Sequence, residues 1–232
     1  MQYETDAYAR RIVAKAVANP EGMVVLDDTV FYPVGGGQPG DTGVLELADG
    51  RRIRIVDSRR APWDPRMILH VPEAPVDIEM GADVIAEIDW QRRHLHMRMH
   101  TCLHLLCAVV DAPVTGCSIG TDRGRLDFDL PEPTIDRDGV TERLTQLIGR
   151  CIPVTTRTVI AEELHSVPEL VRSRSVVPPM YDGQVRVVDI VGVDLQACGG
   201  THVAHTGEIG VVRCAKIEKK SRHNRRVVIE FN

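Results

Sequence analysis

The chain has 232 residues, of which 43% are hydrophobic and 26% are charged, and its formal net charge at pH 7 is -5. This length supports one large domain or two small ones with a real hydrophobic core, and the composition excludes a disordered or low-complexity protein. The acidic balance excludes general attraction to nucleic acid, so any RNA contact must come from a local cluster of positive charge.

The N-terminal residues and the cysteines indicate a cytoplasmic protein. The first residues carry acidic side chains instead of an apolar signal region, and no apolar stretch approaches the roughly eighteen residues of a membrane span. The six cysteines lack the spacing of a disulfide scaffold, and two of them lie inside one predicted helix. We therefore expect reduced cysteines in a cytoplasmic protein with no membrane partner.

Residues 1–88 contain short apolar segments separated by turn signals. Such closely spaced strands are typical of a small β-barrel or a sandwich. A glycine-rich stretch, "GGGQPGDTG" at 35–43, lacks the Lys-Ser/Thr ending of a phosphate-binding loop, so we interpret it as a tight turn. The predicted strands cover 22–33, 44–50, 51–58 and 83–89.

A different pattern begins at Asp89, whose side chain is suited to cap a helix over 90–110. Helical and strand patterns then alternate, and we place a Pro-containing connector after residue 161. The sequence predicts strands at 124–130, 152–161, 184–195, 207–219 and 225–231, and a second helix at 139–151. The fold class is therefore α+β, with a β-barrel-like domain at 1–88 and a domain at 89–232 that combines an antiparallel sheet with helices.

Three histidines stand four residues apart on the predicted helix, at His96, His100 and His104. Residues four apart lie on one helix face within about 6 Å, so two of these imidazoles can share one cation. Both the first pair and the second pair satisfy this geometry, and the spacing alone does not choose between them.

A second half-site lies about ninety residues later in "QACGGTHVAHTGEIG", where Cys198 precedes His202 by four residues in a glycine-containing turn. Cysteine and histidine are the ligand types that zinc prefers. The chain has neither the paired C-x-x-C of most structural zinc sites nor the H-E-x-x-H of metalloproteases. The other interpretation is a buried cysteine beside a histidine that bonds a loop carbonyl.

Three separated segments resemble a known family. "MRMHTCLHLL" at 97–106 and "CGGTHVAHTGEIG" at 198–210 are similar to the editing domain of alanyl-tRNA synthetase and to its freestanding relatives, the AlaX-type trans-editing proteins. "FYPVGGGQPGDTG" at 31–43 is similar to the segment that precedes this domain in the synthetase and in medium-length AlaX proteins. The editing domain of threonyl-tRNA synthetase shares the two half-sites. The resemblance thus implies a second domain of the threonyl/alanyl-tRNA synthetase second-additional-domain type.

The resemblance also implies a ligand set and a reaction. The metal ligands carried over, which are also the catalytic residues, are His100, His104, Cys198 and His202, with one zinc ion per chain and with His96 outside the set. The implied substrate is alanine tRNA mischarged with serine or glycine, and the reaction is hydrolysis of the aminoacyl ester. The ion either activates a water or holds the amino group of the substrate, and the sequence does not decide between these roles. The residues expected to contact the substrate are Thr101, Gly199, Gly200 and Thr201.

Positive charge gathers in the segment 213–226, which carries seven Lys and Arg side chains against one acid, Glu218. Beside an editing site we expect it to contact tRNA phosphates, with no role in DNA binding. Arg92 and Arg98 extend this set, whereas Arg125 is expected to pair with Asp127 or Asp129. The predicted RNA-binding residues are Arg93, Lys216, Lys219, Lys220, Arg225 and Arg226.

Two other functions are consistent with these features. One is an editing hydrolase for another mischarged tRNA or for a free aminoacyl ester. The other is an RNA-binding module, without catalysis, whose zinc is structural.

Overall fold

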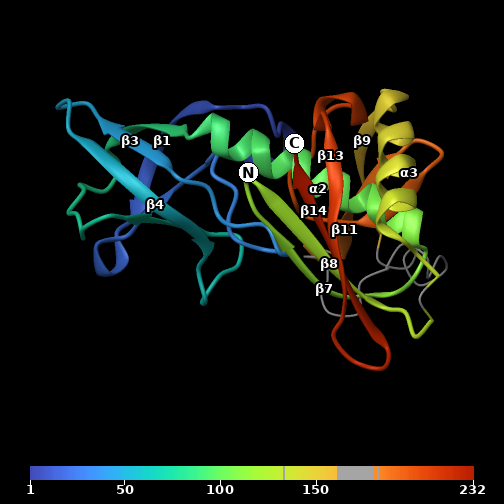
Figure 1. The fold of residues 1–232 in the computed structure, drawn as a ribbon. Helices are drawn as coiled ribbons and strands as arrows, with labels where there is room; N and C mark the ends of the chain where they lie inside the picture. Colours follow the sequence, from blue (N-terminus) through green and yellow to red (C-terminus); the bar gives the residue numbers. More distant parts are fainter. Residues whose placement is uncertain (133, 161–179, 182) are drawn as a thin grey trace. The chain divides into compact units, whose positions relative to one another are not determined.

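The computed structural model describes residues 1–132, 134–160, 180–181 and 183–232. The chain divides into an N-terminal unit, Met1–His94, and a C-terminal unit, Leu95–Asn232, and Figure 1 shows the order of their elements. This division falls inside a helix and lies after the boundary predicted at residue 88. The connector predicted after residue 161 lies largely outside the described residues.

The N-terminal unit is a closed barrel of six antiparallel strands in the order β1-β2-β5-β4-β3-β6. The β-barrel expected for this region is therefore confirmed. Its strands are β1 (Arg11–Ala18), β2 (Val24–Leu26), β3 (Gly43–Leu47), β4 (Arg52–Arg60), β5 (Ile68–Pro72) and β6 (Asp83–Ile88). Two short helical segments accompany them, α1 (Gln2–Thr5) and η1 (Pro20–Gly22). β1 and β5 were not predicted, because both break the apolar alternation with charged or Pro residues.

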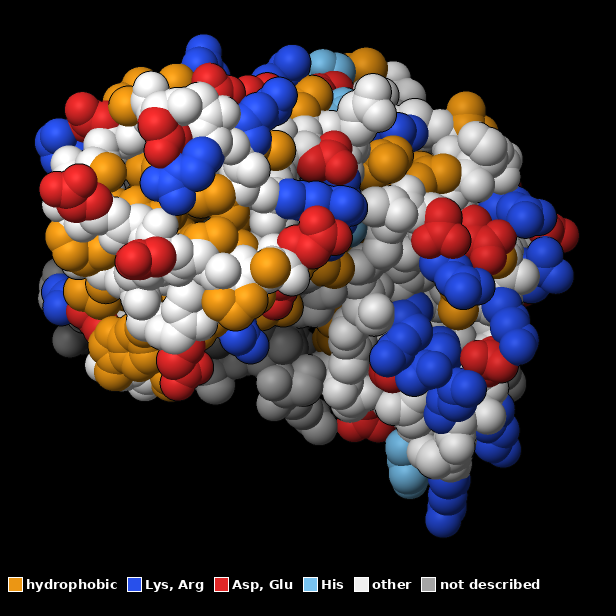
Figure 2. Space-filling model, turned by 90° about the vertical axis from the view of Figure 1, so that its left-hand side faces the viewer, with side chains coloured by type: hydrophobic (Ala, Val, Ile, Leu, Met, Phe, Trp, Pro, Cys, Tyr) orange, Lys and Arg blue, Asp and Glu red, His pale blue; other side chains and the backbone are white. Residues whose placement is uncertain are grey.

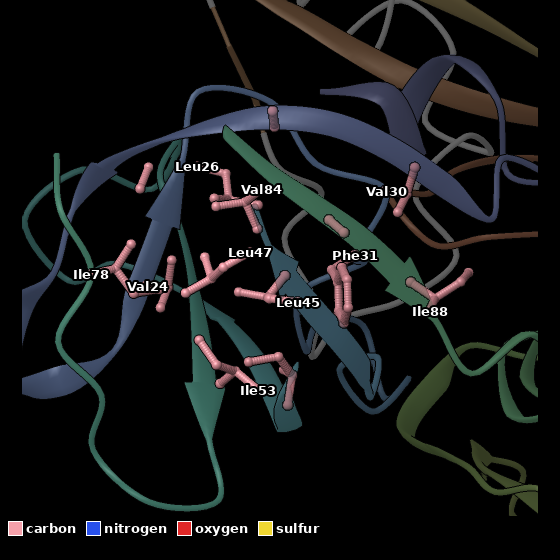
Figure 3. Packing of buried hydrophobic residues seen from close by; sticks show 14 residues of the cluster. Val24, Leu26, Val30, Phe31, Leu45, Leu47, Ile53, Ile78, Val84 and Ile88 are labelled. Carbon is pink, nitrogen blue, oxygen red and sulfur yellow. The ribbon is translucent and has the colours of Figure 1, made fainter. Parts of the chain in front are cut away.

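Alternating apolar residues on these strands fill the barrel (Figure 3). On β4 the buried positions Ile53 and Ile55 are separated by exposed arginine, and β6 buries Val84 and Ile88 in the same alternating way. A period of two places these side chains on one face, and closure of the sheet turns that face inward. Phe31 completes the packing from the loop after β2.

The glycine-rich stretch 35–43 forms a tight turn in the N-terminal unit. Gly37 has a φ of +82°, which a residue with a side chain rarely adopts. A Cβ atom at Gly40 would lie 2.1 Å from the backbone oxygen of Ser58. These glycines therefore serve close backbone packing, in agreement with their interpretation as a structural turn.

The C-terminal unit contains most of the long helix α2 (Trp90–Val110), whose bounds match the predicted helix. The carboxylate of Asp89 accepts a hydrogen bond from the backbone N–H of Arg92 and so caps the helix as expected. From Met97 onward α2 is buried on nearly all sides, as expected of a helix at the centre of a unit. The second helix, α3 (Arg137–Gly149), begins two residues before the predicted helix, at the N-cap Asp136.

Two antiparallel sheets complete the described part of this unit and confirm the α+β class. One has the strand order β13-β14-β8-β7, and in the other β11 pairs with β9, β10 and β12. A single turn of 3-10 helix, η3 (Thr206–Ile209), precedes β13. The strands are β7 (Val114–Ile119), β8 (Arg123–Asp129), β9 (Val154–Ile160), β10 (Met180–Tyr181), β11 (Gln184–Ile190), β12 (Asp194–Ala197), β13 (Val212–Lys219) and β14 (Asn224–Phe231).

The single strand predicted at 184–195 is wrong. The chain reverses at Gly192, whose φ is +72°, so that β11 and β12 form a hairpin. The apolar run hides this turn in the sequence, because one glycine is a weak turn signal inside a strand pattern. The reversal is important for the site, since it brings residues of β12 next to α2.

No helix in the described part of the chain is long and apolar enough to cross a membrane.

Candidate metal centre

Four side chains from two distant segments converge in the C-terminal unit. One ligand atom each from His100, His104, Cys198 and His202 lies within 4.8 Å of every other. The first two come from α2, and the other two come from the turn after β12. The three imidazoles are buried, whereas Cys198 is partly exposed.

The helix supplies its pair by simple periodicity. The rings of His100 and His104, one turn apart on α2, have centroids 5.3 Å apart, and the ring of His202 lies 4.2 Å from that of His100. His96 is buried but lies outside the converging group. Helical spacing allows either histidine pair, and the structure brings the second pair together with the distant half-site.

Cys198 lies at hydrogen-bonding distance from two imidazoles. Its Sγ atom is 3.5 Å from His100 Nε2 and 3.4 Å from His202 Nε2. In a tetrahedral zinc site a sulfur and a nitrogen ligand are separated by roughly 3.6 Å, given bonds of about 2.3 and 2.0 Å. Both distances in the protein are close to that value, so this part of the group needs little rearrangement to hold an ion.

The members of the group differ in how their surroundings shift their pKa values. Although burial raises the pKa of the Cys198 thiol, the charge of His100 and the hydrogen bonds with His100 and His104 oppose it, and this pKa lies well below its ordinary value. Burial and the charge of His100 lower the pKa of His202 well below its ordinary value. Burial also lowers the pKa of His104, but hydrogen bonds with Asp194 and Cys198 raise it to about 10. A thiolate and a neutral imidazole are the forms in which these residues bind metals, so the shifts of Cys198 and His202 favour ligation, whereas His104 must release a proton when a metal binds.

The turn that carries Cys198 is held in shape by β11. The guanidinium of Arg186 donates to the backbone oxygens of Cys198 and Gly200, at 3.0 and 2.7 Å. The backbone N–H of Gly200 points at the sulfur of Cys198, 3.4 Å away. Arg186 thus fixes the two carbonyls on either side of Gly199, and with them the direction of the Cys-Gly-Gly backbone.

The residues predicted to contact the substrate occupy different environments. Gly199 is partly exposed beside Cys198, and Gly200 and Thr201 are buried in the same turn. Thr101 is fully buried, and its hydroxyl lies 3.1 Å from His202 Nδ1. The hydroxyl of Thr101 is therefore engaged inside the protein and is not available to sense a substrate.

Two of the predicted RNA-binding residues are not on a surface. Arg93 is 0% exposed, and within the N-terminal unit its guanidinium pairs with the buried carboxylate of Asp41 and donates to the backbone oxygen of Val30. Arg225 is 7% exposed and donates to the backbone oxygens of Ser221 and Pro131. The RNA-binding role predicted for Arg93 and Arg225 is withdrawn, because both cations are held by internal acceptors.

The other two α2 arginines also bond to backbone. Arg92 donates to the backbone oxygen of Gly40, and Arg98 donates to that of Ile209. Neither extends a free basic surface.

The remaining predicted RNA-binding residues, Lys216, Lys219, Lys220 and Arg226, lie on β13, β14 and the turn between them, and Lys and Arg side chains gather low on the right in Figure 2. Arg226 makes two hydrogen bonds to Asp127, which also pairs with Arg125 as predicted. Glu218 pairs with both Lys216 and Lys220. Lys216, Lys219, Lys220 and Arg222 are exposed.

Three residues that support the group were not predicted from the sequence: Asp194 and Gln196 on β12, and Arg186 on β11. Asp194 accepts a hydrogen bond from His104 and from Gln196, and both of these β12 side chains are buried. A signal existed: Asp194, Gln196 and Cys198 alternate, which places three polar side chains on one face of a strand. Arg186, by contrast, gives no such signal, since its partners are backbone oxygens.

Comparison with known proteins agrees with the two-part organisation. The family model described as threonyl and alanyl tRNA synthetase second additional domain matches residues 185–228, and the model of class II (A) tRNA synthetases matches residues 5–92.

Full-length relatives are similar over nearly the whole chain. An alanyl-tRNA editing protein AlaX-M of Methanosarcina barkeri is 36% identical over 97% of this chain and 96% of its own length. An AlaX-M protein of Saccharolobus solfataricus is 32% identical, with 97% and 95% covered. An alanine-tRNA ligase of Pyrobaculum calidifontis is 35% identical over 92% of this chain, which corresponds to 25% of that ligase.

Proposed function

The chain belongs to the AlaX-M family of alanyl-tRNA editing proteins, and on this basis we propose that it hydrolyses the ester of mischarged alanine tRNA. Serine is the expected main wrong amino acid, and glycine is a further one. The observation that carries the proposal is the convergence of His100, His104, Cys198 and His202 in a chain of this family. Such a protein would act in the cytoplasm, where charged tRNA is used.

The side chains fit zinc better than a hard cation. Three imidazoles and one thiolate form a donor set typical of zinc, and calcium or magnesium would require oxygen ligands. The sulfur-to-nitrogen distances of 3.5 and 3.4 Å suit a tetrahedral ion. We therefore propose one zinc ion per chain at these four residues.

The chemistry asked of the site is modest, because an aminoacyl ester is already reactive. A zinc ion bound there would supply positive charge, either to a water molecule or to the substrate itself. Cys198 is the partly exposed member of the group, so we place the substrate on the side of the Cys-Gly-Gly turn. Gly199 and Gly200 lack side chains, which permits close approach of the reacting ester to the backbone. Arg186 holds this backbone in position.

The need for editing follows from the small difference between the amino acids. A pocket built for alanine excludes glycine poorly and rejects serine weakly, since serine adds one hydroxyl group. The editing site must then spare alanine. A buried polar group that bonds the serine hydroxyl would do so, because alanine leaves that group unpaired. Of the two threonines considered for this task, Thr201 stays in the proposal and Thr101 does not.

The decisive experiment compares hydrolysis of serine-charged and alanine-charged forms of the same alanine tRNA transcript. One hydrogen bond to a buried group is worth roughly 1 to 3 kcal/mol, so we expect the serine ester to react about 5- to 150-fold faster. Equal rates would show a general esterase and contradict the proposal. Binding of the tRNA without hydrolysis of either ester would favour the RNA-binding module with a structural zinc, and faster hydrolysis from another tRNA would favour a different editing substrate.

A further inference from the structure

The hydroxyl of Thr101 has no capacity left for a ligand. It donates its single hydrogen to the backbone oxygen of Met97, one turn earlier on α2, at 3.0 Å. Its oxygen also accepts from the backbone N–H of Val203, at 3.3 Å, and lies 3.1 Å from His202 Nδ1. Because the hydroxyl hydrogen is already used, the oxygen acts as an acceptor toward His202, and Nδ1 must carry the hydrogen.

Asp194 likewise requires that Nδ1 of His104 carry the hydrogen. Its Oδ2 atom lies 3.1 Å from His104 Nδ1 and accepts a second hydrogen bond from the side chain of Gln196, at 2.8 Å. The carboxyl side chain is completely buried. An ionised carboxylate only accepts hydrogen bonds, so Nδ1 of His104 is again the nitrogen that carries the hydrogen.

We infer that Thr101 and Asp194 are positioning residues, which hold His202 and His104 in the tautomer that offers Nε2 to the metal. The inference rests on the proposed function, since it assumes that the four-residue group binds zinc. A neutral imidazole has a hydrogen on one nitrogen and a lone pair on the other, so a fixed hydrogen on Nδ1 leaves the lone pair on Nε2. Partners of this kind orient the ring and raise the basicity of the ligand.

A positioning role for Thr101 can be distinguished from a substrate-sensing role by measuring metal affinity in the absence of substrate. A residue that senses the serine hydroxyl would change the rate with serine esters and leave metal affinity unchanged. A residue that orients His202 would change metal affinity with no substrate present. Loss of such an outer partner typically weakens metal binding about 10- to 100-fold.

The barrel contains a matched control. Thr29 is buried, accepts from the backbone N–H of Phe31, and is bonded to a histidine, His70, at 2.8 Å. It therefore resembles Thr101 in burial and in bond types but lies in the N-terminal unit, remote in sequence from the four converging residues. Thr29→Val removes a buried threonine-histidine hydrogen bond without touching the proposed ligands.

The experiment measures the zinc dissociation constant of the full-length protein by competition with a chelator, and the visible spectrum of the protein loaded with cobalt(II). We expect Thr101→Val to weaken zinc binding about 10- to 100-fold and to change the cobalt spectrum. Thr101→Ser should have the same zinc dissociation constant and cobalt(II) spectrum as the parent, because serine keeps the hydroxyl. Thr29→Val should leave both unchanged, even if it lowers the unfolding temperature.

A second variant keeps the inference testable if Thr101→Val does not fold. Asp194→Asn preserves the volume but removes the charge, so it should weaken zinc binding, and Asp194→Ala should weaken it more. Zinc affinities equal to that of the parent in the folded Thr101 and Asp194 variants would overturn the inference alone. A parent protein that binds no zinc would overturn the proposed site, and the inference with it.

Discussion

Buried histidines occur in both units, and their hydrogen bonds differ in one respect. In the barrel, both ring nitrogens of His70 are engaged, with Nδ1 2.9 Å from the backbone oxygen of Val24 and Nε2 2.8 Å from the hydroxyl of Thr29. In the C-terminal unit, His104 and His202 each bond a protein oxygen through Nδ1. Their other contact is with the sulfur of Cys198, which lies 3.4 Å from His202 Nε2 and is also hydrogen-bonded with His104.

This difference shows what distinguishes a structural histidine from a candidate ligand. Burial does not separate them, because all three imidazoles are almost inaccessible. A neighbouring threonine does not separate them either, because His70 and His202 each have one. The useful quantity is what the two ring nitrogens meet. Both nitrogens of the packing residue His70 meet protein oxygens, whereas a candidate ligand meets one protein oxygen, which sets its tautomer, and the sulfur of Cys198.

The largest expected effect is on zinc content, and it comes from removing one of the four proposed metal ligands. His104→Ala should reduce the zinc content from about one ion per chain to near zero, because the site loses a ligand and its link to Asp194. His70→Ala and His96→Ala should keep their zinc. Metal analysis of the purified variants by atomic emission measures this. If His96→Ala lost the metal and His104→Ala kept it, the ligand pair on α2 would be the other one.

The features of the site that could be predicted from the sequence are those encoded locally. The bounds of α2 followed from the Asp89 cap and a long run without Gly or Pro, and helical periodicity brought His100 and His104 to one face. Both depend on residues within one or two turns. The choice between the two histidine pairs depended on the resemblance to editing domains, since spacing allowed either pair.

The features that could not be predicted depend on contacts between distant residues. Asp194 bonds a histidine ninety positions away, and only the turn at Gly192 makes this contact possible. Arg93 belongs to the predicted ligand helix, yet its partner Asp41 lies in the glycine-rich turn. An arginine in a sequence suggests a surface charge, because buried cations are rare unless paired, and the pairing is not visible locally.

A smaller effect is expected in the pH dependence of the free energy of unfolding, to which the buried histidine of the barrel, His70, contributes. Burial lowers the pKa of His70 to about 4, although the bond to Val24 opposes it. An unfolded chain binds a proton at this histidine near pH 6.5, so the folded state loses stability as pH falls from 6.5 toward 4. The shift corresponds to about 3 kcal/mol, which His70→Gln should remove from the pH dependence of unfolding.

Fluorescence can report this change in one unit, because both tryptophans, Trp63 and Trp90, lie in Met1–His94. Denaturant unfolding followed at pH 7 and at pH 4 gives the free energy at each pH. The control is His205→Gln, at a half-exposed histidine of the C-terminal unit, which should leave the fluorescence-detected unfolding of Met1–His94 as in the parent. Identical pH profiles for the parent and His70→Gln would mean that His70 is protonated in the folded barrel.

The smallest expected effect concerns positive charge, which also differs between the units. The β13–β14 hairpin exposes Lys219, Lys220 and Arg222, whereas the barrel exposes Arg52 and Arg54 on β4. If the hairpin contacts tRNA phosphates, changing its three cations to alanine should flatten the slope of log affinity against log salt by up to about 3. The barrel variant with both arginines replaced should keep the parent slope, and both variants should keep their zinc. Filter binding of an alanine tRNA transcript across salt concentrations measures the slopes.

An unchanged slope in the hairpin variant would mean that its cations are ordinary solvated side chains. A flatter slope in the barrel variant would mean that β4, and not the hairpin, contacts the tRNA phosphates.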